Sequence, residues 1–126
     1  MKTILIVDDD KSIRYSLKRM LEGSFAVFTS QNGEEALQRV EENAPDLIIM
    51  DIKMPGQSGI DVLKEIKKID PKSLVILMTA YGTTETAIEA MKYGAFYYIV
   101  KLFPIPQMKE LVEKAIFLRK LSLAIL

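Results

Sequence analysis

The stretch ILIVDDD, residues 4–10, decides the fold of this chain, because four apolar residues run directly into three carboxylates. Three further apolar runs also end in a polar residue: LIIM (47–50) before Asp51, LVILM (74–78) before Thr79, and FYYIV (96–100) before Lys101. Short apolar runs of this kind are typical of strands that are buried on both faces of a parallel sheet. The C-terminal ends of such strands share one edge of the sheet, where ligands bind. We therefore expect carboxylates, a hydroxyl and an ammonium to converge at one place.

The segments between these runs have a helical pattern, so strand and helix alternate five times along the chain. A shorter apolar run at residues 25–28 supplies the remaining strand, and because it is the least apolar of the five we expect it at an edge of the sheet. In the fourth helical segment, the spacing of the apolar residues turns Ala87, Ile88 and Met91 inward. Repeated strand–helix units predict an α/β domain with a parallel sheet and right-handed crossovers.

The composition fits one globular domain and argues against several kinds of function. The 126 residues are enough for a real core, and 49% hydrophobic residues with a mean hydropathy of +0.14 argue against disorder. The 17 basic residues balance the 17 acidic ones, so charge gives no case for a nucleic-acid partner or a membrane surface. No apolar stretch approaches the ~20 residues that span a bilayer. The lack of cysteine and of a leader-like N-terminus favours the cytoplasm.

Three acidic residues at the strand ends, Asp8, Asp9 and Asp51, indicate a cation site. Two carboxylates about 4 Å apart repel by about 4 kcal/mol at an effective dielectric constant of about 20, so protonation or a cation must relieve the repulsion. Oxygen ligands without histidine or cysteine favour Mg²⁺, which keeps several waters and takes one or two carboxylates. The simpler alternative is that residues 8–10 only cap the first helix, but this leaves Asp51 unexplained.

Thr79 and Lys101 extend the site to phosphate chemistry, although each is a weak signal alone. Together with a metal they supply the hydroxyl donor and the fixed cation that a phosphoryl group requires. Because no histidine, cysteine or buried serine competes, a carboxylate is the expected nucleophile, which forms an aspartyl phosphate. The glycine-rich phosphate loops of nucleotide-binding proteins are missing. A Mg²⁺-dependent phosphohydrolase that uses Asp8 and Asp10 is conceivable, but the chain has no room for a substrate-gating cap domain.

Four segments resemble the receiver domain of bacterial two-component response regulators, over essentially the whole chain. They are ILIVDDD (4–10), MDIKMPGQSG (50–59), MTAYG (78–82) and GAFYYIVKLF (94–103), and they look most like NtrC-type receivers. The resemblance implies a flavodoxin-like (βα)₅ three-layer sandwich with a five-stranded parallel sheet of order 2-1-3-4-5. It also implies a cytoplasmic phosphorylation switch in transcription regulation, not an enzyme. Its only chemistry would be autophosphorylation and autodephosphorylation, with no turnover of an external substrate.

The resemblance assigns the central chemistry to Asp51, which is expected to accept a phosphoryl group from a histidine kinase. Asp9 and Asp51 are expected to bind Mg²⁺ together with the backbone carbonyl of Lys53. Asp8 is expected to assist through a water molecule. The resemblance therefore implies Mg²⁺ as the cofactor, which is the same cation that the oxygen ligands favour.

The resemblance also assigns the response to phosphorylation. Thr79 is expected to bond a phosphoryl oxygen, and Lys101 to pair with the phosphoryl group. Tyr98 matches the aromatic switch position of the family, whose ring moves inward as the threonine moves; a plain strand aromatic is the alternative. Lys53 and Tyr81 match positions that tune how fast the phosphoryl group is hydrolysed, and a bulky Tyr81 is expected to shield it from water.

The departures from the family pattern cluster around the end of the fifth strand. Leu102 stands where the family has proline, and a cis bond before a non-proline residue costs about 2.5–4 kcal/mol. We therefore expect either a trans bond that re-aims Lys101, which is the favoured alternative, or a strained cis bond that its surroundings hold in place. Pro104 replaces a helix-capping aspartate, and Tyr97 stands where NtrC-type receivers often have aspartate. A second interpretation follows: an interaction module of the same fold that no longer switches, because Lys101 is displaced.

The last helical segment predicts a partner surface. Residues 1–120 are expected to form the receiver domain, and residues 121–126 to extend the last helix toward an output domain missing from this chain. The apolar residues at heptad-like spacing are Met108, Leu111, Ala115, Leu118 and Ile125. They fit a face that packs on the sheet or a dimer seam. We expect a homodimer through the last two helices, with no nucleic acid contacted by this domain and no membrane.

Overall fold

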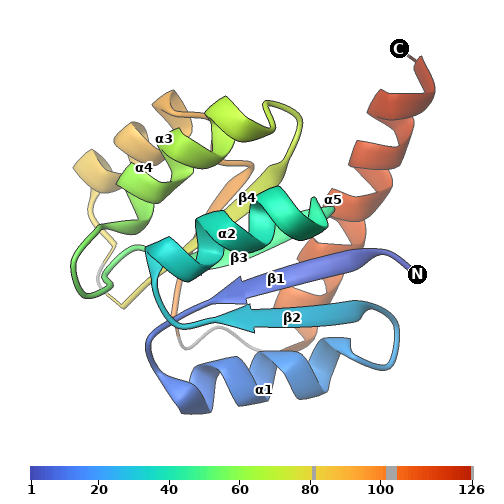
Figure 1. Cartoon of the computed structure of the whole chain (residues 1–126), viewed down its shortest axis with the longest axis horizontal. Coiled ribbons are helices and arrows are strands. Elements are labelled where there is room, and N and C mark those ends of the chain that lie inside the picture. Colours follow the sequence, from blue (N-terminus) through green and yellow to red (C-terminus); the bar gives the residue numbers. More distant parts are fainter. Residues whose placement is uncertain (81, 102–104, 126) are drawn as a thin grey trace.

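The computed structural model describes residues 1–80, 82–101 and 105–125, in which strands and helices alternate (Figure 1). The strands are β1 (Thr3–Val7), β2 (Ala26–Ser30), β3 (Leu47–Asp51), β4 (Leu74–Thr79) and β5 (Tyr97–Val100). The helices are α1 (Lys11–Leu21), α2 (Gly33–Asn43), α3 (Gly59–Ile69), α4 (Thr84–Lys92) and α5 (Ile105–Ile125). The predicted alternation of strand and helix is therefore confirmed.

The five strands pair in parallel in the order β2-β1-β3-β4-β5, which confirms the predicted topology. The edge position of the second strand is also confirmed, although this strand runs from Ala26 to Ser30 and not over 25–28. The register sets Val7 beside Met50, and Asp51 beside Met78. The strands therefore end nearly level, and the polar residues that follow them share one edge of the sheet.

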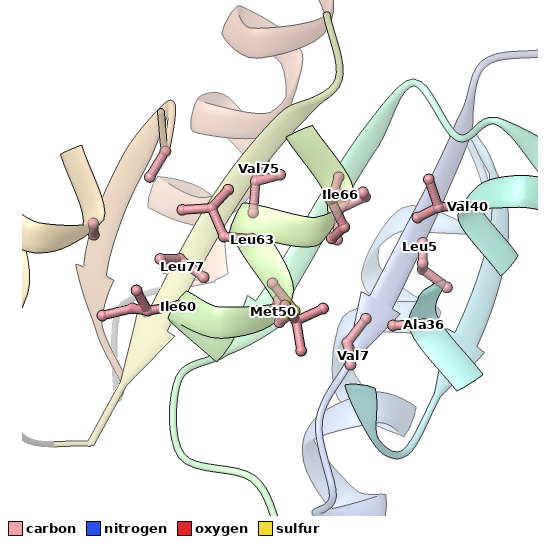
Figure 2. Packing of buried hydrophobic residues seen from close by; sticks show 14 of the residues in the cluster. Leu5, Val7, Ala36, Val40, Met50, Ile60, Leu63, Ile66, Val75 and Leu77 are labelled. Carbon is pink, nitrogen blue, oxygen red and sulfur yellow. The ribbon is translucent and has the colours of Figure 1, made fainter. Parts of the chain in front are cut away.

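Each face of the sheet has its own hydrophobic core. Helices α2, α3 and α4 cover one face, and α1 and α5 cover the other (Figure 1). Side chains alternate along β1, so that Leu5 joins the core under α2 and α3, whereas Ile4 joins the core under α1 and α5. Figure 2 shows the first core, in which Leu63 of α3 lies close to Val75 and Leu77 of β4. Burial on both faces explains why these strands consist of continuous apolar residues in the sequence.

The fourth helix buries a different face from the one predicted. Ala90 is the buried residue of α4, whereas Ile88 and Met91 are 64% and 52% exposed. The expectation that Ile88 and Met91 turn inward is therefore wrong. Successive residues differ by about 100° around a helix, so a face centred on Ala90 turns Met91 sideways and Ile88 away from the sheet.

The last helix packs on the sheet through its first half and continues beyond it. Met108, Val112 and Ala115 are buried, but Leu118 is 43% exposed. Further along, Arg119 forms an ion pair with Asp46, which directly precedes β3 at the N-terminal end of the strand. The helix runs on to Ile125 and projects past the strands (Figure 1). In the part of the chain that the structure describes, no helix is both long and apolar enough to cross a membrane.

Several sequence predictions fall outside the described residues. They concern Tyr81, the conformation of the bond between Lys101 and Leu102, and Pro104. The side chain of Ile125 is likewise outside the described part. These remain predictions.

Candidate functional site

Three carboxylates meet at the C-terminal edge of the sheet. Asp8 and Asp9 follow β1 directly, and Asp51 is the last residue of β3. One carboxylate oxygen from each residue lies within 4.8 Å of the other two. Asp8 is fully buried and Asp51 is 4% exposed, whereas Asp9 faces solvent. The structure therefore brings together the three acidic residues that the sequence singles out.

Hydrogen bonds hold Asp8 between β1 and α1. Its Oδ1 accepts from the Asp10 amide at 2.9 Å, and its carbonyl oxygen accepts from Arg14 Nη1 at 2.7 Å. The helix cap itself is Asp10, whose Oδ1 accepts from the Ser12 amide at 2.9 Å and from the Ser12 hydroxyl at 2.7 Å. These bonds lower the pKa of Asp10. Because one aspartate is enough to cap α1, the alternative that the whole acidic run serves as a cap does not account for the other two carboxylates.

A close approach between β3 and α3 fixes the position of Asp51. The Gly59 amide donates to the Ile52 carbonyl at 2.7 Å, and Ser58 caps α3. A Cβ atom at Gly59 would clash with the carbonyl oxygen of Asp51 and would lie 2.8 Å from Ile52 Cα. Only glycine fits at this point without a shift of the backbone that carries Asp51. The sequence indicates a tight turn here, but only the structure reveals that its last glycine is a packing requirement.

Lys101 reaches both buried carboxylates. Its Nζ atom lies 3.0 Å from Asp8 Oδ2 and 3.1 Å from Asp51 Oδ2. Its amide donates to the Thr79 carbonyl at 2.6 Å, which ties the end of β5 to the end of β4. The expectation that Leu102 re-aims or displaces Lys101 is therefore wrong, and the interpretation as a non-switching module loses its structural basis.

The charges of the site shift the pKa values of two of its residues. Burial raises the pKa of Asp51, the nearby carboxylate of Asp8 raises it further, and Lys101 offsets part of the effect. Burial by itself lowers the pKa of Lys101, but hydrogen bonds and attraction to the two carboxylates outweigh it, so that this pKa is raised. The ammonium therefore stays charged at neutral pH, and among the described residues it is the side-chain cation that forms ion pairs with this group of three carboxylates. Such an excess of negative charge attracts a further cation.

The donor atoms fit Mg²⁺. All three side chains of the acidic group offer oxygen, the ligand that this hard cation prefers. Asp9 and Asp51 line a cavity of about 660 Å³ together with Lys53, Thr79 and Lys101, which leaves space for the waters that Mg²⁺ retains. The Lys53 amide lies 3.4 Å from Asp51 Oδ1, so the main chain of Lys53 runs beside the acidic group.

Two threonines, Thr79 and Thr86, also border the cavity. Thr79 ends β4 and is 7% exposed. Thr86, in the first turn of α4, is a residue that the sequence pattern did not single out. Its hydroxyl lies 2.7 Å from the hydroxyl of Tyr98, which is half-buried on β5. The one available signal was the position of Thr86 three residues after a threonine that can cap a helix.

Comparison with known proteins assigns the family. Residues 4–113 match the response regulator receiver domain. The chain belongs to this family. This receiver domain is 42% identical over 114 residues to the DNA-binding transcriptional regulator NtrC of Escherichia coli K12, a match that covers 90% of this chain and 24% of NtrC. It is 40% identical over 124 residues to the regulatory protein AtoC of the same strain, covering 94% of this chain and 26% of AtoC. The receiver domain thus spans about a quarter of the length of these curated relatives.

Solved receiver domains have the same fold. A response regulator receiver domain protein from Clostridium thermocellum has a TM-score of 0.91 and 38% identity, covering 97% of this chain and 99% of that chain. The beryllofluoride-activated NtrC4 receiver domain dimer has a TM-score of 0.89 and 32% identity, covering 94% and 99%. These similarities confirm the flavodoxin-like receiver fold, and the relatives confirm the resemblance to NtrC-type receivers. The protein is therefore a signalling domain of the two-component type.

Proposed function

We propose that this receiver domain is a phosphorylation switch in which Asp51 accepts a phosphoryl group from a histidine kinase in the presence of Mg²⁺. The observation that carries the proposal is the setting of Asp51. This residue ends a central strand and lines a cavity that Asp9, Thr79 and Lys101 also line. With no histidine or cysteine in the chain, a carboxylate is the available nucleophile, and its product is an aspartyl phosphate.

The acidic group would both bind the metal and supply the nucleophile for phosphoryl transfer. A carboxylate oxygen of Asp51 would attack phosphorus while the bond from phosphorus to the histidine nitrogen of the kinase breaks. Asp9, Asp51 and the Lys53 carbonyl would hold Mg²⁺, with Asp8 acting through water. When bound, the cation neutralises charge on the phosphoryl oxygens. The carboxylates of Asp9 and Asp8 thus have their role before the transfer, because they hold the cation beside the nucleophile.

Lys101 and Thr79 would respond to the new charge, which amounts to about 1.5–2 negative charges on a phosphorylated side chain at neutral pH. Lys101 Nζ already lies 3.1 Å from Asp51 Oδ2, so a small movement would pair it with a phosphoryl oxygen. Thr79 would donate its hydroxyl to another oxygen. The movement of Thr79 would favour the inward position of Tyr98, and the change would pass to α4 and α5.

The surface around α4 and β5 is the proposed output surface. It exposes Ile88 and Met91 on α4, and Tyr97 and Val100 on β5. Apolar side chains that gather on a surface mark an interaction site. A similar receiver, the beryllofluoride-activated NtrC4 domain, is a dimer. We propose that phosphorylation controls a homodimer through the last two helices, or the contact with an output domain in transcription regulation.

The test is phosphorylation of the purified chain by acetyl phosphate and Mg²⁺, followed by intact-protein mass spectrometry. We expect one phosphoryl group on the wild-type chain and none on Asp51→Asn. The matched control is Asp10→Asn, which removes a neighbouring carboxylate but keeps a residue that caps helices equally well. It should be labelled like the wild type. Labelling of Asp51→Asn, or no labelling of the wild-type chain, would contradict the proposal.

Two further measurements separate the alternatives and test the tuning residues. A phosphohydrolase would release many phosphates per chain from small phosphate esters, whereas we expect no such turnover. A module that does not switch would keep the same size in light scattering with and without beryllofluoride. The proposed roles of Lys53 and Tyr81 are tested by the lifetime of the phosphoryl group, which we expect to be shorter in Tyr81→Ala because water gains access.

A further inference from the structure

Thr86 connects the side chain of Tyr98 to the start of α4. Its amide donates to Thr83 Oγ1 at 3.1 Å, and the Thr83 amide donates to Thr86 Oγ1 at 3.3 Å, which closes a capping box. The same Thr86 hydroxyl donates to the Thr83 carbonyl at 3.1 Å and lies 2.7 Å from Tyr98 Oη. A threonine hydroxyl has one proton to donate. Either of the two hydroxyls can be the donor of the bond between Thr86 and Tyr98.

The ring of Tyr98 is held inward in this arrangement. It packs against the core under α3 and α4, and it lies close to Gly82, two residues before α4. A Cβ atom placed at Gly82 would lie 3.5 Å from both Cε1 and Oη of Tyr98. Thr86 itself lines the cavity that contains Asp51. One hydroxyl therefore joins three parts of the molecule: the aromatic ring on β5, the first turn of α4, and the wall of the proposed phosphorylation site.

We propose that Thr86 is a positioning residue that holds Tyr98 inward before phosphorylation. The inference rests on the proposed function, in which the inward ring belongs to the phosphorylated state. If Thr86 stabilises this state by a direct hydrogen bond, the unphosphorylated chain is already biased toward it. A ligand that prefers one of two states binds more tightly when that state is more populated. Thr86 should therefore raise the affinity of Asp51 for a phosphoryl analogue.

The expected size of the effect follows from a single hydrogen bond. Such a bond contributes about 0.5–1.5 kcal/mol net, and a factor of ten in affinity corresponds to about 1.4 kcal/mol. Loss of the bond should therefore weaken binding of beryllofluoride by about two- to tenfold. The effect cannot exceed the preference of beryllofluoride for the inward state.

The experiment combines two variants and their double variant. Thr86→Val removes the hydroxyl and keeps the shape of the side chain, whereas Tyr98→Phe removes the other partner and leaves the capping box intact. Beryllofluoride is titrated with Mg²⁺ and followed by amide NMR signals. The position of ring 98 is read without beryllofluoride, from nuclear Overhauser effects between its protons and those of Gly82. Thr86→Ser should restore both readouts. The matched control is Thr84→Val, the same change at an exposed residue of the same turn.

We expect each single variant to weaken beryllofluoride binding by a similar factor, and the double variant to weaken it no further, because one shared bond is lost in all three. A purely structural role in capping would weaken binding in Thr86→Val but not in Tyr98→Phe, and would overturn the inference. Unchanged ring contacts in Thr86→Val would overturn it as well. If the wild-type chain binds no beryllofluoride, the proposed function fails, and the ring contacts alone then decide whether Thr86 positions Tyr98.

Discussion

Replacement of Asp9 by asparagine separates the electrostatic cost of the acidic group from its affinity for a metal. The Asp9 carboxylate contributes one of three oxygens that lie within 4.8 Å of one another. At such a separation, one pair of charges repels by about 0.9 kcal/mol at the dielectric constant of water and by about 3.5 kcal/mol at an effective value of about 20. Asp9 is exposed, so the lower value applies to its pairs with Asp8 and Asp51. The attraction of Lys101 offsets part of this repulsion, and we expect Asp9→Asn to raise the free energy of unfolding by about 1 kcal/mol without metal.

Urea unfolding followed by circular dichroism, first in EDTA and then with Mg²⁺, measures both effects. At a typical urea dependence of about 1–3 kcal/mol per molar, the midpoint in EDTA should increase by about 0.3–1 M. In the wild-type chain, Mg²⁺ at about one hundred times its dissociation constant should add about 2.7 kcal/mol, and Asp9→Asn should lose most of this gain. Asp10→Asn is the control, and the gain in stability that Mg²⁺ gives it should equal that of the wild type.

Two results would refute this reasoning. If Asp9→Asn lowers the midpoint in EDTA, the Asp9 carboxylate stabilises the folded chain, and its attraction to Lys101 outweighs its repulsion by Asp8 and Asp51. If Mg²⁺ stabilises Asp9→Asn as much as the wild-type chain, Asp9 does not hold the cation.

Three other changes test the surroundings of the site. Gly59→Ala sets a methyl group against the backbone of Asp51 and Ile52, so we expect a loss of about 1–3 kcal/mol in urea unfolding and slower labelling by acetyl phosphate. Lys101→Met leaves two buried carboxylates without their ammonium, so stability in EDTA should decrease by about 3–5 kcal/mol, and Mg²⁺ should restore part of it. Burial lowers the pKa of Lys67 below its usual 10.5, so the unfolded chain binds more protons between the two values and the free energy of unfolding rises with pH over this window. Lys67→Met should remove that rise in urea titrations at a series of alkaline pH values.

The architecture could be predicted because local patterns determine it. Buried strands require continuous apolar runs, and the helices between them require parallel pairing, so the order of elements along the chain and the parallel sheet follow from these patterns. The strand order 2-1-3-4-5 came from the resemblance to the receiver family. The exposed face of α4 could not be predicted in this way. A hydrophobic pattern does not distinguish a residue that packs in the core, such as Ala90, from apolar residues such as Ile88 and Met91 that lie on the surface.

The candidate site was predictable to the extent that its residues follow strands. Asp8, Asp51 and Thr79 come at the ends of buried strands, and parallel pairing alone brings them together. Gly59 and Thr86 were not predictable, because their importance comes from contacts across the fold. The first is required by the distance between two backbones, and the second by a tyrosine twelve residues later in the chain.

The place of Lys101 depends on contacts that precede the bond to Leu102. Its amide is fixed by the Thr79 carbonyl, so β4 determines where the side chain begins. From that point the flexible stem carries Nζ to two buried carboxylates, at 3.0 and 3.1 Å. Each attraction amounts to about 5 kcal/mol at an effective dielectric constant of about 20, before the cost of desolvation. The family's preference for proline after the lysine concerns the cis form of the bond between the two residues. Before a residue other than proline, the cis form costs about 2.5–4 kcal/mol relative to the trans form. Because the two attractions act on the lysine itself, the loss of proline at the next position leaves the ammonium in the site.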